Sequence, residues 1–268
     1  MQLVRAGHLK KYLQVAEISL TNRVVYLADH FASSIFLLLI LFIFSQLWRT
    51  VLGAGGTLAG LDSTGMLWYM VFTEVIVIST PAYHRLVSDE VKSGDIAYKL
   101  NRPYSYTLYY LAAHCGEFAI RFVTNLAIGA VFAYLTMGPL QVAWAQLGWV
   151  IISFSLAMVL TFLMNFSLAL LAFWFEDNRP FFWIQSKLVF IFGGMFVPVE
   201  AYPAGLRIVS YLLPMRYGVS APARLMVDFD YAFLWQVLLG QFIWATILSL
   251  ITAAMFQKGV RRVHVNGG

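Results

Sequence analysis

Three charged residues, Glu74, Glu117 and Arg121, lie within long apolar segments of this sequence. A charged side chain costs about 2.5–3.5 kcal/mol at the centre of a membrane helix, so each of the three calls for a partner or a function. Glu117 and Arg121 are four residues apart, which places them on one helical face where they can form an ion pair. Two interpretations stay open: a buried ion cluster that fixes helix packing, or the polar lining of a substrate path.

Other familiar patterns of catalytic or ligand-binding residues are missing from the sequence. Residues 55–60 have the glycine spacing of a phosphate-binding loop, but Leu61 and Asp62 follow where that loop requires Lys and Ser or Thr. The five histidines form no pair with metal-ligand spacing, and the sequence has no Gly-x-Ser-x-Gly motif. The single cysteine, Cys115, can form no internal disulfide. We therefore expect no catalytic residue, no bound cofactor and no metal in this chain.

The composition of the chain is typical of a membrane protein. Of the 268 residues 60% are apolar and only 12% are charged, whereas soluble domains carry about 25% charged residues. We predict an all-α integral membrane protein that forms a single transmembrane domain over residues 1–268. The formal net charge is +5, and the basic residues lie in loops beside apolar segments rather than on one face. This distribution excludes a basic nucleic-acid-binding face.

The hydropathy pattern predicts six transmembrane helices of roughly 20 residues or more. They are expected near residues 31–52, 66–83, 111–136, 147–175, 181–198 and 233–256. Residues 1–26 alternate charged and apolar positions at helical spacing, which predicts an amphipathic helix at the membrane interface.

An outer-face segment over residues 199–230 is too interrupted by proline for one span, and we expect short interfacial helices there. Just before it, Gly193 and Gly194 indicate either close helix packing at the end of a span or a re-entrant element. Pro198 and Pro203 belong to the same re-entrant candidate.

The distribution of Lys and Arg fixes the predicted orientation. With six spans, both termini, residues 84–103 and the loop at 176–187 share one side, which holds 13 of the 18 Lys and Arg residues. The opposite side holds four. Because basic residues are enriched in cytoplasmic loops, we expect both termini in the cytoplasm.

A charged region, residues 84–103, stands between the second and third predicted spans. It carries seven charged side chains within 18 positions, of both signs. Two helix-like pieces are separated by Ser93, Gly94 and Asp95, and a loop that only reverses the chain needs no such hinge. We interpret the region as a docking element for a cytoplasmic partner. The alternative is an ordinary solvated loop.

The sequence resembles the membrane permease subunits of ATP-binding-cassette transporters of the type-2 export class, in its prokaryotic six-span branch. The resemblance covers nearly the whole chain. Its features are the surface helix, the stretch Glu-Val-Lys-Ser-Gly-Asp-Ile-Ala-Tyr-Lys-Leu-Asn-Arg-Pro-Tyr-Ser-Tyr at 90–106, Gly193-Gly194 to Pro198, Tyr202-Pro203, Leu213-Pro214 and the basic tail at 258–262.

The resemblance implies a permease in the prokaryotic cytoplasmic membrane that exports an amphipathic or hydrophobic substrate. It implies two permeases, identical or different, and two copies of a separate ATPase that binds ATP and Mg. The charged region then forms the coupling helix, and its expected ATPase-docking residues are Arg85, Asp89, Glu90, Lys92, Ser93, Gly94, Asp95 and Lys99. Two alternatives remain: an ion- or proton-coupled carrier that uses Glu74, Glu117 and Arg121, and a non-transporting scaffold subunit of an envelope complex.

Overall fold

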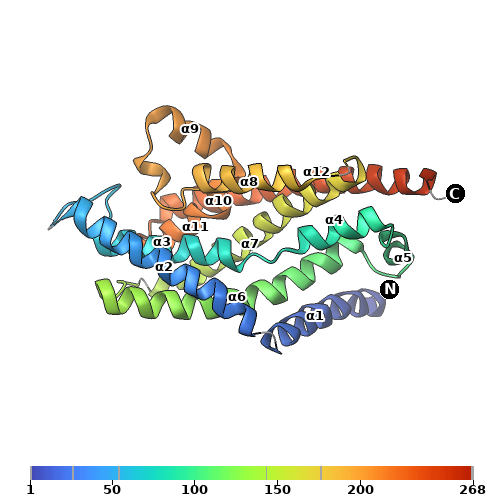
Figure 1. Ribbon diagram of the computed structural model, residues 1–268, viewed down its shortest axis with the longest axis horizontal. Helices are drawn as coiled ribbons and strands as arrows, with labels where there is room; N and C mark the ends of the chain where they lie inside the picture. The colour runs from blue at the N-terminus through green and yellow to red at the C-terminus, as the bar shows by residue number, and fades with distance from the viewer. Residues whose placement is uncertain (1, 26, 54, 143, 176, 267–268) are drawn as a thin grey trace.

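The computed structural model describes the backbone of residues 2–25, 27–53, 55–142, 144–175 and 177–266, and the side chains of residues 10–21, 34–53, 55–142, 144–175 and 177–262. Every regular element within these ranges is helical, which confirms the predicted all-α fold. Figure 1 shows the long helices running along the long axis of the molecule, with the start of α1 and the end of α12 at the same end.

The helices follow one another in a simple order. They are α1 (Gln2–Val25), α2 (Leu27–Leu52), α3 (Ser63–Ser79), α4 (Tyr83–Ser93), α5 (Ile96–Leu100), α6 (Tyr106–Met137), η1 (Trp144–Gln146), α7 (Leu147–Ala169), η2 (Leu170–Phe173), α8 (Arg179–Phe192), η3 (Val199–Ala201), α9 (Ala204–Leu212), α10 (Pro214–Gly218), α11 (Ser220–Val227) and α12 (Tyr231–Asn266).

Five helical segments in the described ranges are long and apolar enough to cross a membrane: Ser34–Leu52, Ser63–Ser93, Tyr106–Met137, Trp144–Phe173 and Tyr231–Arg262. The remaining predicted span corresponds to α8, which has 14 residues. At 1.5 Å per residue α8 extends about 21 Å, less than the roughly 30 Å of a bilayer core. The count of six full spans is therefore not confirmed, because α8 ends at Phe192 and the chain turns before Pro198.

The ends of α3 and α6 show how local sequence sets these boundaries. The Asp62 side chain accepts a hydrogen bond of 2.7 Å from the backbone N–H of Gly65 and caps α3. Ser105 caps α6 in the same way, with a hydrogen bond of 3.4 Å from the N–H of Leu108. Gly138 ends α6 with a φ of +93°, a conformation that glycine adopts without strain.

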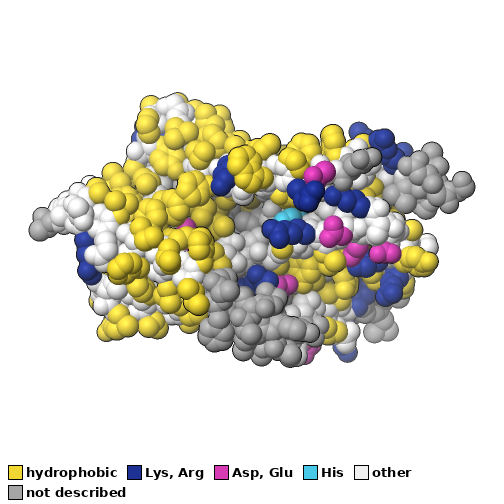
Figure 2. All heavy atoms as spheres, in the orientation of Figure 1, with side chains coloured by type: hydrophobic (Ala, Val, Ile, Leu, Met, Phe, Trp, Pro, Cys, Tyr) yellow, Lys and Arg dark blue, Asp and Glu magenta, His cyan; other side chains and the backbone are white. Residues whose placement is uncertain are grey.

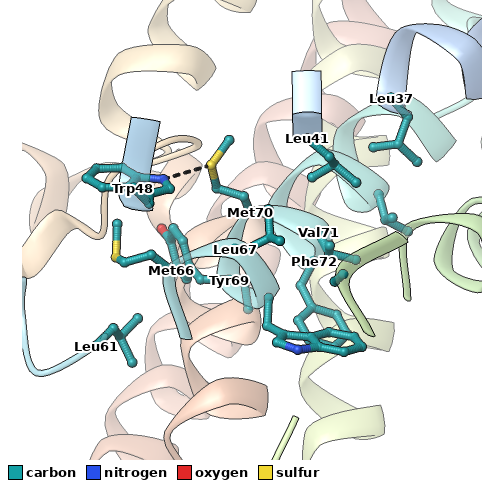
Figure 3. Close-up of a cluster of buried hydrophobic side chains, with 14 residues drawn as sticks. Leu37, Leu41, Trp48, Leu61, Met66, Leu67, Tyr69, Met70, Val71 and Phe72 are labelled. Atoms are coloured by element: carbon teal, nitrogen blue, oxygen red, sulfur yellow. Dashed lines mark hydrogen bonds between the residues drawn. The ribbon is translucent and has the colours of Figure 1, made fainter. Parts of the chain in front are cut away.

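The core of the bundle surrounds α3, which is buried along most of its length. Figure 3 shows side chains of α2 and α3 packed together, with the indole N–H of Trp48 directed at the sulfur of Met70 at 3.2 Å. On another side α6 approaches closely at Gly129, where a Cβ atom would lie 2.9 Å from Val71 Cγ1. Small residues of this kind let membrane helices pack at short range.

The outer-face segment consists of the short helices η3, α9, α10 and α11, as its prolines predict. Sequence inspection did not reveal what holds these helices together. Arg216 is 2% exposed, bonds to Glu200 at 3.2 Å and stacks on the ring of Tyr211, with its guanidinium carbon 3.7 Å from the ring centre. A buried guanidinium needs such partners because an unpaired charge is costly to desolvate.

Candidate functional site

The charged region folds into two helices with a sharp break between them. Gly94 ends α4 with a φ of +83°, in the left-handed conformation that glycine favours. After this residue, Asp95 precedes α5, and the Ser93 hydroxyl donates to the Asp95 carboxylate at 2.9 Å. The predicted hinge at residues 93–95 is therefore confirmed. We call α4, Gly94, Asp95 and α5 the coupling turn.

A buried carboxylate fixes the coupling turn to the start of α6. Glu90 is 6% exposed, and its Oε2 accepts a hydrogen bond of 2.7 Å from the Tyr106 hydroxyl. Its other oxygen accepts from Lys99 Nζ and from the Tyr110 hydroxyl, and Lys99 also donates to the Tyr110 hydroxyl at 2.8 Å. Both side chains bind α6 within the chain, and the docking role expected of Glu90 and Lys99 stays a prediction.

The other predicted docking residues face outward. The exposed set consists of Arg85, Asp89, Lys92, Ser93, Gly94 and Asp95. Figure 2 shows charged side chains of both signs gathered over α4 and α5, while mainly hydrophobic side chains cover the opposite end of this face. Tyr98, on α5, is 77% exposed. The sequence analysis did not single it out, although a large aromatic between charged residues is a recognisable sign of a contact surface.

The helix α1 is attached to the loop that joins the coupling turn to α6. Lys11 Nζ donates to the carbonyl oxygen of Pro103 at 2.8 Å, and the N–H of Ser105 donates to the Tyr12 hydroxyl at 2.8 Å. Further along α6, a Cβ atom on Gly116 would lie 2.0 Å from the carbonyl oxygen of Ala16. The predicted surface helix thus packs backbone to backbone on α6 and also binds the loop before it.

Comparison with protein families agrees with this architecture. A family model described as "ABC-2 family transporter protein" matches residues 35–267, most of the chain. The chain belongs to the ABC-2 transporter family. A search of curated proteins finds no match. Family membership makes this chain a multi-pass membrane transport component and supports the permease role in an ABC exporter.

The three charged residues within the spans of this ABC-2 chain do not form one cluster. Arg121 donates to Glu117 along α6, as the four-residue spacing predicts. Glu74 is 2% exposed on α3, and its Oε1 has no hydrogen-bond partner among the described residues. Neither Glu117 nor Arg121 forms an ion pair with Glu74 in the described part of the chain.

The same three residues also differ in their access to cavities. Glu117 lines a cavity of about 450 Å³ between α1, α4 and α6, together with Tyr83, Lys99 and Tyr109. Glu74 and Arg121 line neither this cavity nor a larger one beside α8. A continuous relay through all three, as an ion- or proton-coupled carrier would need, has no geometric support.

We expect the substitution Glu74→Gln to leave the stability of this ABC-2 permease unchanged or to raise it by about 1 kcal/mol, because a neutral amide is cheaper to bury than a carboxylate without a partner. Unfolding in detergent measures this directly. If transport by the folded variant is also unchanged, the lining interpretation of Glu74 is wrong.

The residues predicted for the re-entrant element divide into two pairs. Gly193 and Gly194 are buried directly after α8, and the carbonyl oxygen of Gly194 accepts a hydrogen bond from the Tyr69 hydroxyl. Pro198 is buried before η3, whereas Pro203 is exposed before α9. The glycine geometry fits a closely packed helix end, and the re-entrant interpretation of the four residues stays a prediction.

Proposed function

We propose that this chain is the membrane-spanning subunit of an ATP-driven exporter and that the coupling turn docks on a separate ATPase. The observation that carries the proposal is the construction of the turn. Its outer surface is charged and presents Tyr98, while the buried Glu90 and the half-buried Lys99 fix its inner surface to α6. We call the hydrogen-bonded group of Glu90, Lys99, Tyr106 and Tyr110 the brace. An element that only connected two helices would not need to be fixed to α6 in this way.

The brace suggests how force passes from the ATPase into the membrane. A push on α5 reaches α6 through Lys99 and Tyr110 and reaches α1 through the contacts of Lys11 and Tyr12. Since α6 runs the length of the bundle, a small displacement at the turn tilts a whole transmembrane helix. The export cycle then alternates access for an amphipathic or hydrophobic cargo taken from the cytoplasm or the inner leaflet.

The proposal places the coupling turn and both termini in the cytoplasm of a prokaryotic cell. The excess of Lys and Arg on that side supports this orientation, and the start of α1, the end of α12 and α5 lie at the same end of the molecule. ATP and Mg bind to the partner, of which two copies serve a pair of permeases, identical or different. A scaffold subunit would share the docking turn but would not move a substrate, so a transport assay separates the two roles.

A photo-reactive amino acid at position 98 tests the docking. In the full chain, co-expressed with each ABC ATPase of the host in turn, we expect illumination to join position 98 to one ATPase. Replacing this exposed aromatic by Ala should weaken ATPase binding by about 30-fold, the effect of losing an interface residue that contributes about 2 kcal/mol.

Trp144 provides the matched control, because it is an aromatic residue that is 76% exposed and follows the end of α6, the long helix whose start adjoins the coupling turn. The same photo-reactive group at 144 should give no cross-link to the ATPase. Equal cross-linking at both positions, or binding that survives scrambling of residues 85–99, would contradict docking on the coupling turn.

A further inference from the structure

A large cavity lies beside α8, on the side of α4 that faces away from α6. Its volume is about 860 Å³, and α3, α4, α7 and α8 all contribute to its walls. Two contacts join α4 to α8 across its edge. The ring of His84 packs on Phe182 with centroids 4.4 Å apart, and the side-chain amide of Asn178 donates to the Ser88 hydroxyl at 2.8 Å. We call this cavity the α4–α8 groove.

The walls of the groove contain acceptor atoms that have no donor. Asn178 is fully buried and Gln185 is 8% exposed, yet Asn178 Oδ1 and Gln185 Oε1 both lack a hydrogen-bond partner among the described residues. The orientation of the Asn178 amide is fixed, because its nitrogen donates to Ser88 and to the carbonyl oxygens of Leu168 and Ala169. An unpaired buried acceptor costs about 1–3 kcal/mol, so two in one groove indicate a ligand with donor groups.

Positive charge lines the same groove. Arg85 and Lys92 are seven residues apart, two turns of α4, so both reach the groove, and neither forms an ion pair with a described residue. Arg179 also lines the groove, but it is already bonded to Asp177 by contacts of 2.9 and 3.0 Å. The acidic side chain in the lining is Asp89, which leaves a net positive charge. Figure 2 shows this group of basic side chains and a histidine beside α8.

An apolar surface continues from the groove along α8. Trp183 lines the groove and is 65% exposed, and Ile184 and Ile191 on the same helix are 48% and 44% exposed. In a membrane-spanning chain, exposed apolar side chains of this kind meet lipid tails. The groove therefore combines a cationic and acceptor-rich pocket with an adjoining surface for hydrocarbon.

We propose that the α4–α8 groove binds a phospholipid of the surrounding bilayer through its headgroup. The phosphate lies between Arg85 and Lys92, and a hydroxyl or ammonium group of the headgroup donates to Asn178 Oδ1 and Gln185 Oε1. The acyl chains follow Trp183 along α8. The bound lipid bridges α4, which carries the coupling turn, to α8. The groove shares Arg85, Asp89 and Lys92 with the exposed surface of the coupling turn, but lipid binding needs the permease alone and can be measured without the ATPase.

Because the two acceptor atoms need hydrogen-bond donors, we expect the groove to prefer headgroups that carry a donor. Phosphatidylglycerol offers hydroxyl donors and phosphatidylethanolamine offers an ammonium group, whereas phosphatidylcholine carries a phosphate but no donor. We expect native mass spectrometry of the purified full chain, after exchange into equal amounts of the three lipids, to show retention of the first two and loss of phosphatidylcholine.

The variant Gln185→Leu removes one acceptor and keeps the side chain's bulk. It should weaken retention of phosphatidylglycerol by about tenfold, the equivalent of one hydrogen bond, and leave phosphatidylcholine unaffected. Lys187→Gln is the matched control, because Lys187 is an exposed cation on the same helix that does not line the groove. ATPase cross-linking at position 98 should be unchanged in both variants, so failure of the lipid site and failure of the docking proposal are distinguishable.

Three results would overturn the lipid site. Equal retention of all three lipids would show that the acceptors select nothing. Unchanged selectivity in the folded Gln185→Leu variant would show that the headgroup does not bind to Gln185 on α8. Displacement of phosphatidylglycerol by glycerol 1-phosphate at equal concentration would show that a free phosphate ester, without acyl chains, is the ligand.

Discussion

Replacing Glu90 by Ala is expected to destabilise the protein by about 3 kcal/mol and to disconnect the coupling turn from α6. The substitution leaves Lys99 Nζ and the hydroxyls of Tyr106 and Tyr110 without their shared acceptor. The positive charge of Lys99, whose side chain is only 30% exposed, would then remain over the ring of Tyr110 without its ion-pair partner. Denaturant unfolding in detergent measures the stability, and transport by the reconstituted complex measures the coupling.

Asp89→Ala is the matched control for this substitution. Asp89 is the preceding residue and carries the same charge, but it is exposed and makes no hydrogen bond among the described residues. Its removal should change stability by less than about 0.5 kcal/mol. A Glu90→Ala variant as stable as Asp89→Ala would show that the hydrogen bonds of Glu90 do not connect the turn to α6.

The contrast between these two neighbouring acids shows where sequence reasoning ends. Residues 89 and 90 have the same charge and stand in the same charged region, so the family resemblance implied a docking role for both. What separates them is the direction of each side chain on α4 and the position of Tyr106 and Tyr110, on a helix that begins after the turn. The partners of Glu90 are 9, 16 and 20 residues away, beyond the reach of a helical-spacing argument.

Predictions from local spacing were more successful. The break at Gly94 follows from the conformational freedom of one glycine, and the Glu117 to Arg121 ion pair follows from a separation of one helical turn. Glu74 had no local partner in the sequence, and its surroundings depend on how α3 is packed by other helices. The length of α8 was overestimated for a related reason: the apolar stretch continues past Gly194, but the backbone does not continue as a helix.

The substitution Gly194→Val is expected to destabilise the protein by about 2–4 kcal/mol, because it combines backbone strain with overpacking. Gly194 has a φ of +65°, which a β-branched residue adopts only with strain. A Cβ atom at this position would lie 2.7 Å from Val199 Cγ2 and 3.1 Å from Ser220 Cβ. Thermal unfolding in detergent should show the loss as a lower midpoint.

Gly205→Val separates this effect from a general intolerance of valine in the chain after α8, because a Cβ atom on Gly205 meets no atom within 4 Å. That variant should unfold like the unmodified protein. The Tyr69 hydroxyl holds the carbonyl oxygen of Gly194, and the Thr73 hydroxyl holds that of Met195 at 2.7 Å, so the turn after α8 is fixed to α3. If Gly194→Val were as stable as Gly205→Val, the added side chain would have to be accommodated by moving the turn away from α3. The hydrogen bonds from Tyr69 and Thr73 would then not hold the turn after α8 in place.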